Sequence, residues 1–270
     1  MATAARPRGE TDGMRRPIAL LVALASAVAL LPGAWAGASA ATTSDGPVMG
    51  ASPAWAPHIP GARRYDGSVP SAVTQVVVVR ASSWSSTTAT LRAYVRDAAG
   101  WRLSATWSAR LGYGGLVLAD QRTQGSGKTP AGIFRVTQAF GRQPDPGARI
   151  PYTKVTTDDW WVQDRRSAYY NQMRRGSQGG FALTTSGYYG SEHLWYMGSK
   201  YDYVTVVDFN RPNPVVGRGS GIFVHAHGTL STGCITVEYA RSRALARWWD
   251  PARSPRIIIG VGSWLDAAPA

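Results

Sequence analysis

The residues that are best suited to catalysis, by their side chains and their spacing, lie between Phe223 and Cys234. Phe223 to His227 alternates like a strand, a loop of small polar residues follows, and the chain's single cysteine comes nine residues after His225. Residues two apart in a strand share a face, so Phe223, His225 and His227 are predicted to point the same way. If the loop turns the chain back, Cys234 lies beside that histidine-bearing face.

A cysteine beside a histidine is the arrangement of a thiol nucleophile. The thiolate is the attacking species, and a neighbouring imidazole accepts the thiol proton. Acyl transfer also needs backbone N–H donors for the oxyanion, and those of Thr232, Gly233 and Cys234 are the candidates. We therefore predict acyl transfer with Cys234 as nucleophile and His225 or His227 as base. His227 could replace His225, orient it or touch the substrate.

The same residues allow two other interpretations. His225 and His227 could bind a zinc ion together with Cys234 or His193, with a nearby glutamate as general base. Cys234 could instead be a small buried hydrophobic side chain. A chelator would inactivate the zinc enzyme, whereas a thiol alkylator would inactivate the cysteine enzyme.

Ser231-Thr232-Gly233-Cys234-Ile235, following a strand that ends in histidine, resembles the catalytic signature of L,D-transpeptidases with a YkuD-type domain. The resemblance is to the actinobacterial-type branch and covers roughly residues 72–265. Further matching stretches are 125–134, 159–162, 169–171, 192–194, 203–210 and 222–225. Many members carry Arg where Thr236 stands, and His or Lys where Thr232 stands. These departures leave open which residues bind the substrate carboxylate.

The resemblance implies a mainly β fold, a YkuD-like β-sandwich of mixed sheets with one or two short helices. It also implies that His225 is the base and that Cys234 attacks the carbonyl of the third residue of a peptidoglycan stem peptide. The terminal D-alanine leaves, protonated by His225, and a thioester remains. An amine of a second stem then attacks the thioester and forms a 3–3 cross-link. From the residues themselves, His227 and Ser231 are expected to bind substrate or support the site, and His193 has either a structural or surface role or lines the site. No metal or organic cofactor is needed. Water as acceptor would make the enzyme an L,D-carboxypeptidase, and a decayed site would leave a non-catalytic cell-wall-binding module.

The N-terminus has the features of a secretory signal. Arg15 and Arg16 precede an apolar run from Ile18 to Leu31, and A-x-A sequences follow at 34–36 and 38–40. We expect a signal peptide over residues 1–40 and an extracytoplasmic, wall-associated protein. An uncleaved signal would instead anchor the chain in the membrane.

The charge balance points to an anionic partner. The 270 residues carry 29 Lys and Arg against 16 Asp and Glu, a formal net charge of +13. Such a surface suits nucleic acid, anionic lipid or an anionic cell-wall polymer. Export argues against nucleic acid, so we expect stem peptides as substrate and anionic wall polymers as further partners.

The elements that must position these residues are mostly strands. Proline and small residues over 41–71 predict a linker or tail, in which His58 is solvated, and the catalytic domain is expected over 72–265. Residues 141–200 are predicted to form long, partly ordered loops. Arg122, Lys128 and Arg135 are expected to be ordinary solvated charges, with the alternative that one of them holds a substrate carboxylate. Strands are predicted over 75–80, 132–137, 203–209, 221–227 and 256–260, a hairpin over 91–105, and a helix over 238–249.

Overall fold

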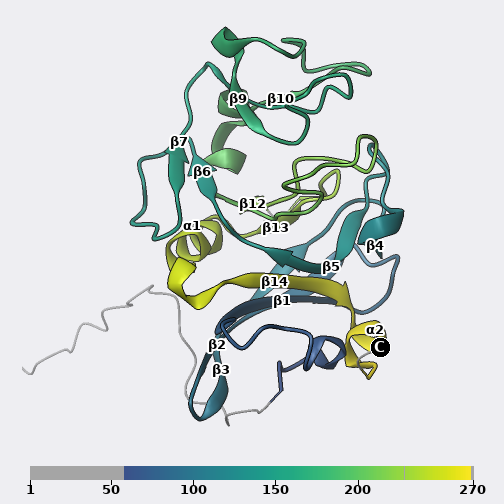
Figure 1. Cartoon of the computed structure of the whole chain (residues 1–270), viewed down its shortest axis with the longest axis vertical. Helices are drawn as coiled ribbons and strands as arrows, with labels where there is room; N and C mark the ends of the chain where they lie inside the picture. Colours follow the sequence, from purple (N-terminus) through teal and green to yellow (C-terminus); the bar gives the residue numbers. More distant parts are fainter. Residues whose placement is uncertain (1–57, 228, 269–270) are drawn as a thin grey trace, which may run out of the picture. The chain divides into compact units, whose positions relative to one another are not determined.

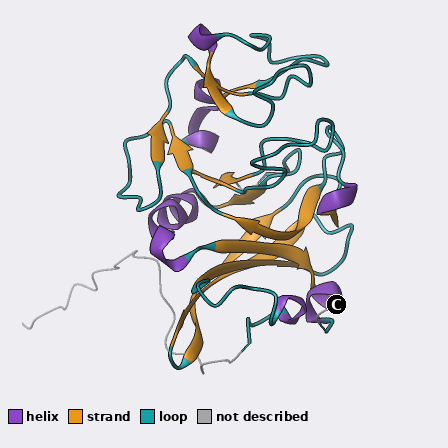
Figure 2. Ribbon diagram, in the orientation of Figure 1, coloured by secondary structure: helices purple, strands orange, loops and turns teal. Residues whose placement is uncertain are grey.

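The computed structural model describes residues 58–227 and 229–268. The expected signal peptide and residues 41–57 of the expected linker lie outside the described residues. In this part of the chain, fourteen strands accompany two α-helices and several 3-10 turns (Figures 1 and 2). This mostly β architecture confirms the predicted fold class. None of the helices described here has the length and apolar character needed to cross a membrane.

Eleven of the strands form one mixed sheet. They are β1 (Gln75–Ala81), β2 (Thr88–Asp97), β3 (Gly100–Arg110), β4 (Leu116–Leu118), β5 (Thr129–Arg135), β6 (Ala139–Gly141), β7 (Tyr152–Lys154), β11 (Val204–Val206), β12 (Phe223–Ala226), β13 (Ile235–Val237) and β14 (Arg256–Val261). Their order is β4-β5-β14-β1-β2-β3-β13-β12-β11-β6-β7. The site-bearing strands β12 and β13 are therefore interior neighbours in this sheet.

A second sheet and several helices complete the described fold. The sheet has the order β10-β8-β9 and consists of β8 (Asp159–Trp161), β9 (Met173–Arg175) and β10 (Glu192–His193). The α-helices are α1 (Tyr239–Trp248) and α2 (Gly262–Asp266). The 3-10 segments are η1 (Arg63–Tyr65), η2 (Ala119–Gln121), η3 (Gly176–Gln178), η4 (Leu194–Tyr201) and η5 (Pro251–Arg253).

Three hydrophobic cores hold these layers together. The central core joins β1, β2, β3 and β14 to β12, β13 and α1, so the large sheet packs on itself. The outer core covers the other face of β1 and β14 with α2 and residues 59–73. The third, which we call the site-side core, lies between β12 and the segment containing β8 and η4, and it includes Cys234.

The predicted strands and helix are present, for the physical reasons that predicted them. In β1, Val77 and Val79 face the central core while Val76 and Val78 face the outer core, so an unbroken apolar run gives a strand buried on both faces. Helix α1 begins after Glu238, whose side chain accepts a hydrogen bond from the Ala240 N–H at 3.0 Å.

Two segments differ from the sequence prediction. Residues 58–71 were assigned to a linker, but Ile59 and Ala62 are buried in the outer core and Tyr65 lies edge-on against Trp264. His58 is exposed, with its ring 3.1 Å from Asp66. Residues 141–200, predicted to be long loops, contain the strands β7 to β10 and the 3-10 segment η4. Each of these strands has only two or three residues, which is too short to show a periodicity in the sequence.

Candidate active site

Cys234 and His225 come from neighbouring parallel strands. In the register of β12 and β13, Val224 lies opposite Ile235 and His225 opposite Thr236, which puts Cys234 beside Phe223. Paired residues of parallel strands share a face, so the thiol and the imidazole project from the same side. Strand spacing and rise separate their Cα atoms by about 8 Å. Burial agrees, because Phe223 and Cys234 pack in the site-side core and Val224 in the central core.

The Cys234 thiol is buried and uncharged at neutral pH. The residue is 5% exposed, and Sγ donates a hydrogen bond to the Gly221 carbonyl at 3.3 Å. Burial raises the thiol pKa to about 12, and the Glu192 carboxylate adds to this, while the Arg122 guanidinium opposes it. The thiol therefore needs a base that removes its proton as it attacks.

The His225 imidazole is also buried and neutral. The residue is 7% exposed, and Nδ1 lies 2.7 Å from the Ala226 carbonyl. A carbonyl only accepts, so Nδ1 carries the proton and Nε2 keeps its lone pair. Burial lowers the His225 pKa to about 4. The ring is thus an unprotonated base at neutral pH, oriented by a backbone carbonyl that carries no sequence signal.

A buried carboxyl group lies behind the thiol. The Tyr201 hydroxyl donates to Glu192 at 2.6 Å, and the Gln163 amide donates to its other oxygen at 2.8 Å. Burial raises the Glu192 pKa, and these two hydrogen bonds oppose the shift. The Tyr201 ring also lies 5.2 Å from the His225 ring. Tyr201 therefore contacts both the Glu192 carboxyl group and the His225 imidazole.

The turn before Cys234 is braced by Ser231. Its Oγ donates to the Cys234 carbonyl at 2.6 Å and accepts from the Gly233 N–H at 3.1 Å. Ser231 was predicted either to bind substrate or to support the site, and these two hydrogen bonds correspond to the supporting role. Because the Gly233 N–H is already bonded, only Thr232 and Cys234 remain candidates for oxyanion donors.

Arg122 is a buried part of the site, which corrects the expectation of a solvated charge. It is 4% exposed and donates to the carbonyls of Lys128 at 2.8 Å, Arg218 at 3.2 Å and Thr232 at 3.5 Å. Burial lowers its pKa. Gly233 has φ +139°, and a Cβ there would lie 2.8 Å from Arg122 Nη2. The guanidinium and the glycine are therefore packed directly together.

The other two candidate site histidines, His227 and His193, have partners of their own. His227 follows β12 with φ 68°, and its Nε2 is 2.9 Å from Ser199 Oγ in η4. His193 stacks on Trp160 at 3.9 Å between ring centroids. Over residues 58–227 and 229–268, no three His, Cys, Asp or Glu side chains are grouped as metal ligands. The zinc-ligand set considered from the sequence is therefore not assembled among these residues.

A cavity of ≈ 330 Å³ reaches the nucleophile turn. Ser220, Gly221 and Thr232 line the end next to Cys234, and Gly221 is the residue that accepts the thiol hydrogen bond. Glu192 and Arg122 contribute opposite charges to its wall.

The catalytic-domain model of the YkuD L,D-transpeptidase family matches residues 76–259. The chain belongs to this family. The matched range includes Cys234 and His225 together with Arg122, Glu192 and Tyr201. A search of curated proteins finds no match. The membership makes the chain an L,D-transpeptidase-type protein with peptidoglycan stem peptides as its substrate class.

The YkuD domain of this chain departs from the family pattern at Thr236, and the structure shows what occupies that region. Thr236 is buried and its hydroxyl donates to the Thr229 carbonyl at 3.0 Å. The cation at the nucleophile turn is instead Arg122, which lies more than a hundred residues earlier in the chain. No local motif links the two segments, so the sequence offered Arg122 only as one of three possible carboxylate contacts and did not predict its contact with the nucleophile turn.

Proposed function

We propose that this chain is an exported, cysteine-dependent L,D-transpeptidase that forms 3–3 cross-links between peptidoglycan stem peptides. The observation that carries the proposal is the placement of Cys234 and His225 on one face of the parallel pair β12–β13, next to a cavity lined by Gly221, whose carbonyl accepts the thiol hydrogen bond. Family membership supports the reaction class.

The proposed reaction has two half-steps that use the same two side chains. His225 takes the thiol proton while Sγ bonds to the carbonyl carbon of the donor's third residue, and the N–H groups of Thr232 and Cys234 stabilise the oxyanion. The bond to D-alanine breaks, and the leaving amine receives the proton from His225. An amine of a second stem then attacks the thioester, passes a proton to His225, and Sγ leaves as a thiolate that His225 reprotonates.

The cavity walls suit a stem residue that carries both charges. Glu192 offers a carboxyl group for an amine, and Arg122 and Arg165 offer guanidiniums for a carboxylate. The resemblance left the carboxylate contact unassigned, and we propose that these arginines provide it. Export is supported by the basic and apolar residues at 15–31, because peptidoglycan lies outside the membrane.

Intact-protein mass after incubation with a carbapenem tests the thiol. We expect one covalent adduct on the wild-type protein, none on Cys234→Ala, and slow formation on His225→Gln. His227→Gln serves as the matched control and should acylate within about twofold of wild type. An adduct that persists in Cys234→Ala would overturn the cysteine mechanism.

Mass spectra of digested muropeptides separate transfer from hydrolysis. Wild-type protein incubated with tetrapeptide-stem muropeptides should yield 3–3 linked dimers, and Cys234→Ala should yield none. Trimmed monomers alone would mean that water is the acceptor and that the enzyme is an L,D-carboxypeptidase. Wall binding without either product would indicate a non-catalytic module.

A further inference from the structure

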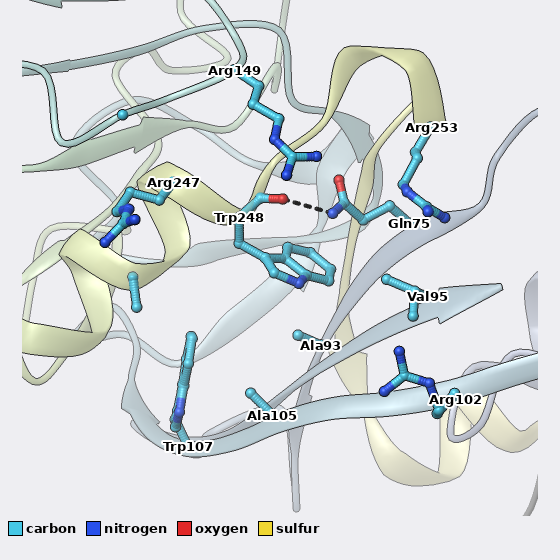
Figure 3. A pocket seen from close by; sticks show the side chains of 12 residues that line it. Gln75, Ala93, Val95, Arg102, Ala105, Trp107, Arg149, Arg247, Trp248 and Arg253 are labelled. Atoms are coloured by element: carbon cyan, nitrogen blue, oxygen red, sulfur yellow. Dashed lines mark hydrogen bonds between the residues drawn. The ribbon is translucent and has the colours of Figure 1, made fainter. Parts of the chain in front are cut away.

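A second cavity, of ≈ 490 Å³, lies away from the nucleophile turn (Figure 3). Its walls come from β2 and β3, from the end of α1, from the loop that precedes β7 and from η5. It shares no lining residue with the cavity beside Cys234. Nothing in the acyl-transfer reaction uses it.

The floor and sides of this cavity are apolar and rigid. Ala93 and Ala105 form a low floor on β2 and β3, and the half-buried indoles of Trp107 and Trp248 stand beside it (Figure 3). The Gln75 amide donates to the Trp248 carbonyl at 2.8 Å, and its oxygen accepts from the Asp250 N–H at 2.8 Å. These bonds fix the end of α1 against β1, so the slot is preformed.

The rim of the cavity is strongly cationic. Arg102, Arg149, Arg247 and Arg253 line it, and none of the described residues in its lining is acidic. Asp250 is the nearest carboxylate that pairs with this rim, 2.8 Å from Arg149 and 3.9 Å from Arg253. Asp250 thus compensates Arg149 and Arg253, and Arg247 has no such carboxylate partner among the described residues.

Arg247 is the least compensated of these groups. It is exposed on the last turn of α1, and within the described residues it makes no hydrogen bond or ion pair. A guanidinium with all donors available binds phosphate or carboxylate oxygens in a bidentate fork. Indole faces provide flat apolar surface for sugar or polyol units. The rim and the walls therefore suit different parts of one ligand.

We propose that this cavity binds a polyanion whose sugar or polyol units carry phosphodiester or carboxylate groups. The anionic groups pair with Arg149, Arg247 and the neighbouring arginines, and a backbone unit packs between Trp107 and Trp248. The central core separates this cavity from the site-side core that contains Cys234. A bound chain would thus hold the protein on an anionic surface while the thiol stays accessible to a peptide.

Direct binding measurements test the site independently of catalysis. The Cys234→Ala protein is titrated by calorimetry with poly(glycerol phosphate), with polygalacturonate and with neutral dextran. We expect at least one polyanion to bind and dextran not to bind, and the two polyanions distinguish a phosphate from a carboxylate ligand. Because the protein lacks the thiol, the result does not depend on the proposed reaction.

Matched double variants separate this cavity from overall charge. Arg149→Gln/Arg247→Gln should weaken polyanion binding by about tenfold or more, as expected for the loss of two charge-assisted contacts. Arg63→Gln/Arg175→Gln removes the same charge from exposed arginines that line neither cavity, and should change affinity less than twofold. Equal loss in both double variants, or no binding of either polyanion, would overturn the proposal.

Discussion

The thiol of Cys234 and the imidazole of His225 are both kept neutral by burial, with pKa values of about 12 and about 4. A preformed thiolate–imidazolium pair would require the opposite order of these values. In the proposed reaction, proton transfer is therefore coupled to attack on substrate. This protects the buried sulfur from other electrophiles until a peptide fills the cavity.

Arg122 sets the geometry of the nucleophile turn, and its replacement by lysine tests this. Lysine keeps the charge but cannot donate to three carbonyls in a fixed fork, so at least one buried carbonyl loses its partner. We expect Arg122→Lys to lose about 2–4 kcal/mol of unfolding free energy, measured by urea denaturation.

Arg63→Lys is the control, because Arg63 is exposed and its replacement should cost less than about 0.5 kcal/mol. If Arg122→Lys unfolds at the same urea concentration as Arg63→Lys, the hydrogen bonds from the buried guanidinium do not stabilise the turn.

At the scale of elements, the two residues of strand β10 point to opposite sides and have different neighbours. Glu192 faces Tyr201 and the thiol, whereas His193 stacks on Trp160. From its place in a loop-like segment, His193 was assigned either a structural or surface role or a role in lining the site. Without a known strand, sequence gives no way to tell which of two adjacent side chains faces the cavity.

Substitutions in β10 test this division through the reactivity of the thiol. Glu192→Gln removes a carboxylate that disfavours the thiolate, so the thiol pKa falls and iodoacetamide alkylation at pH 8 accelerates severalfold. His193→Gln should leave the alkylation rate within about twofold of wild type. Equal rates in the two variants would contradict this assignment of the two faces.

The segment before β1 is part of the folded unit, and Ile59 provides the test. Truncating its buried side chain to alanine should cost about 2–4 kcal/mol, because a cavity forms in the outer core. Thermal unfolding measures the loss. His58→Ala, at an exposed neighbouring position, should change stability by less than about 0.5 kcal/mol. An unchanged melting temperature for Ile59→Ala would show that residues 58–71 add no stability.

Periodicity in the sequence was sufficient to predict β1, the β2–β3 hairpin and α1, because each is long enough to show which faces are buried. The Gly-Cys turn and the strand before it predicted where the candidate nucleophile and base lie. The packing of Arg122 against the nucleophile turn, and the roles of Tyr201 and the Ala226 carbonyl, escaped prediction, since they depend on long-range packing or on backbone atoms. The packing of Ile59 was hidden by surrounding prolines that resemble a linker.

For the whole molecule, the lowered pKa of His225 predicts that the free energy of unfolding decreases in mild acid. Its folded pKa is about 4 and its unfolded pKa about 6.5, so below pH 6.5 the unfolded state binds the proton first. Stability is fully present above pH 6.5 and declines as the pH falls towards 4, by about 3 kcal/mol for this group. Urea denaturation of wild type and His225→Gln from pH 7 to 4 measures it. Wild type should lose about 3 kcal/mol more than the variant, and parallel curves would contradict the prediction.

Strand β12 is shared by two interiors, since Val224 packs in the central core and Phe223 in the site-side core, with His225 next along the chain. A mutation that loosens either interior shifts the same four-residue strand, and the imidazole moves with it. Changes that adapt the protein to a new temperature will therefore also alter its turnover, and laboratory evolution for heat tolerance should recover variants whose catalytic rates have changed although no residue of the cavity was replaced.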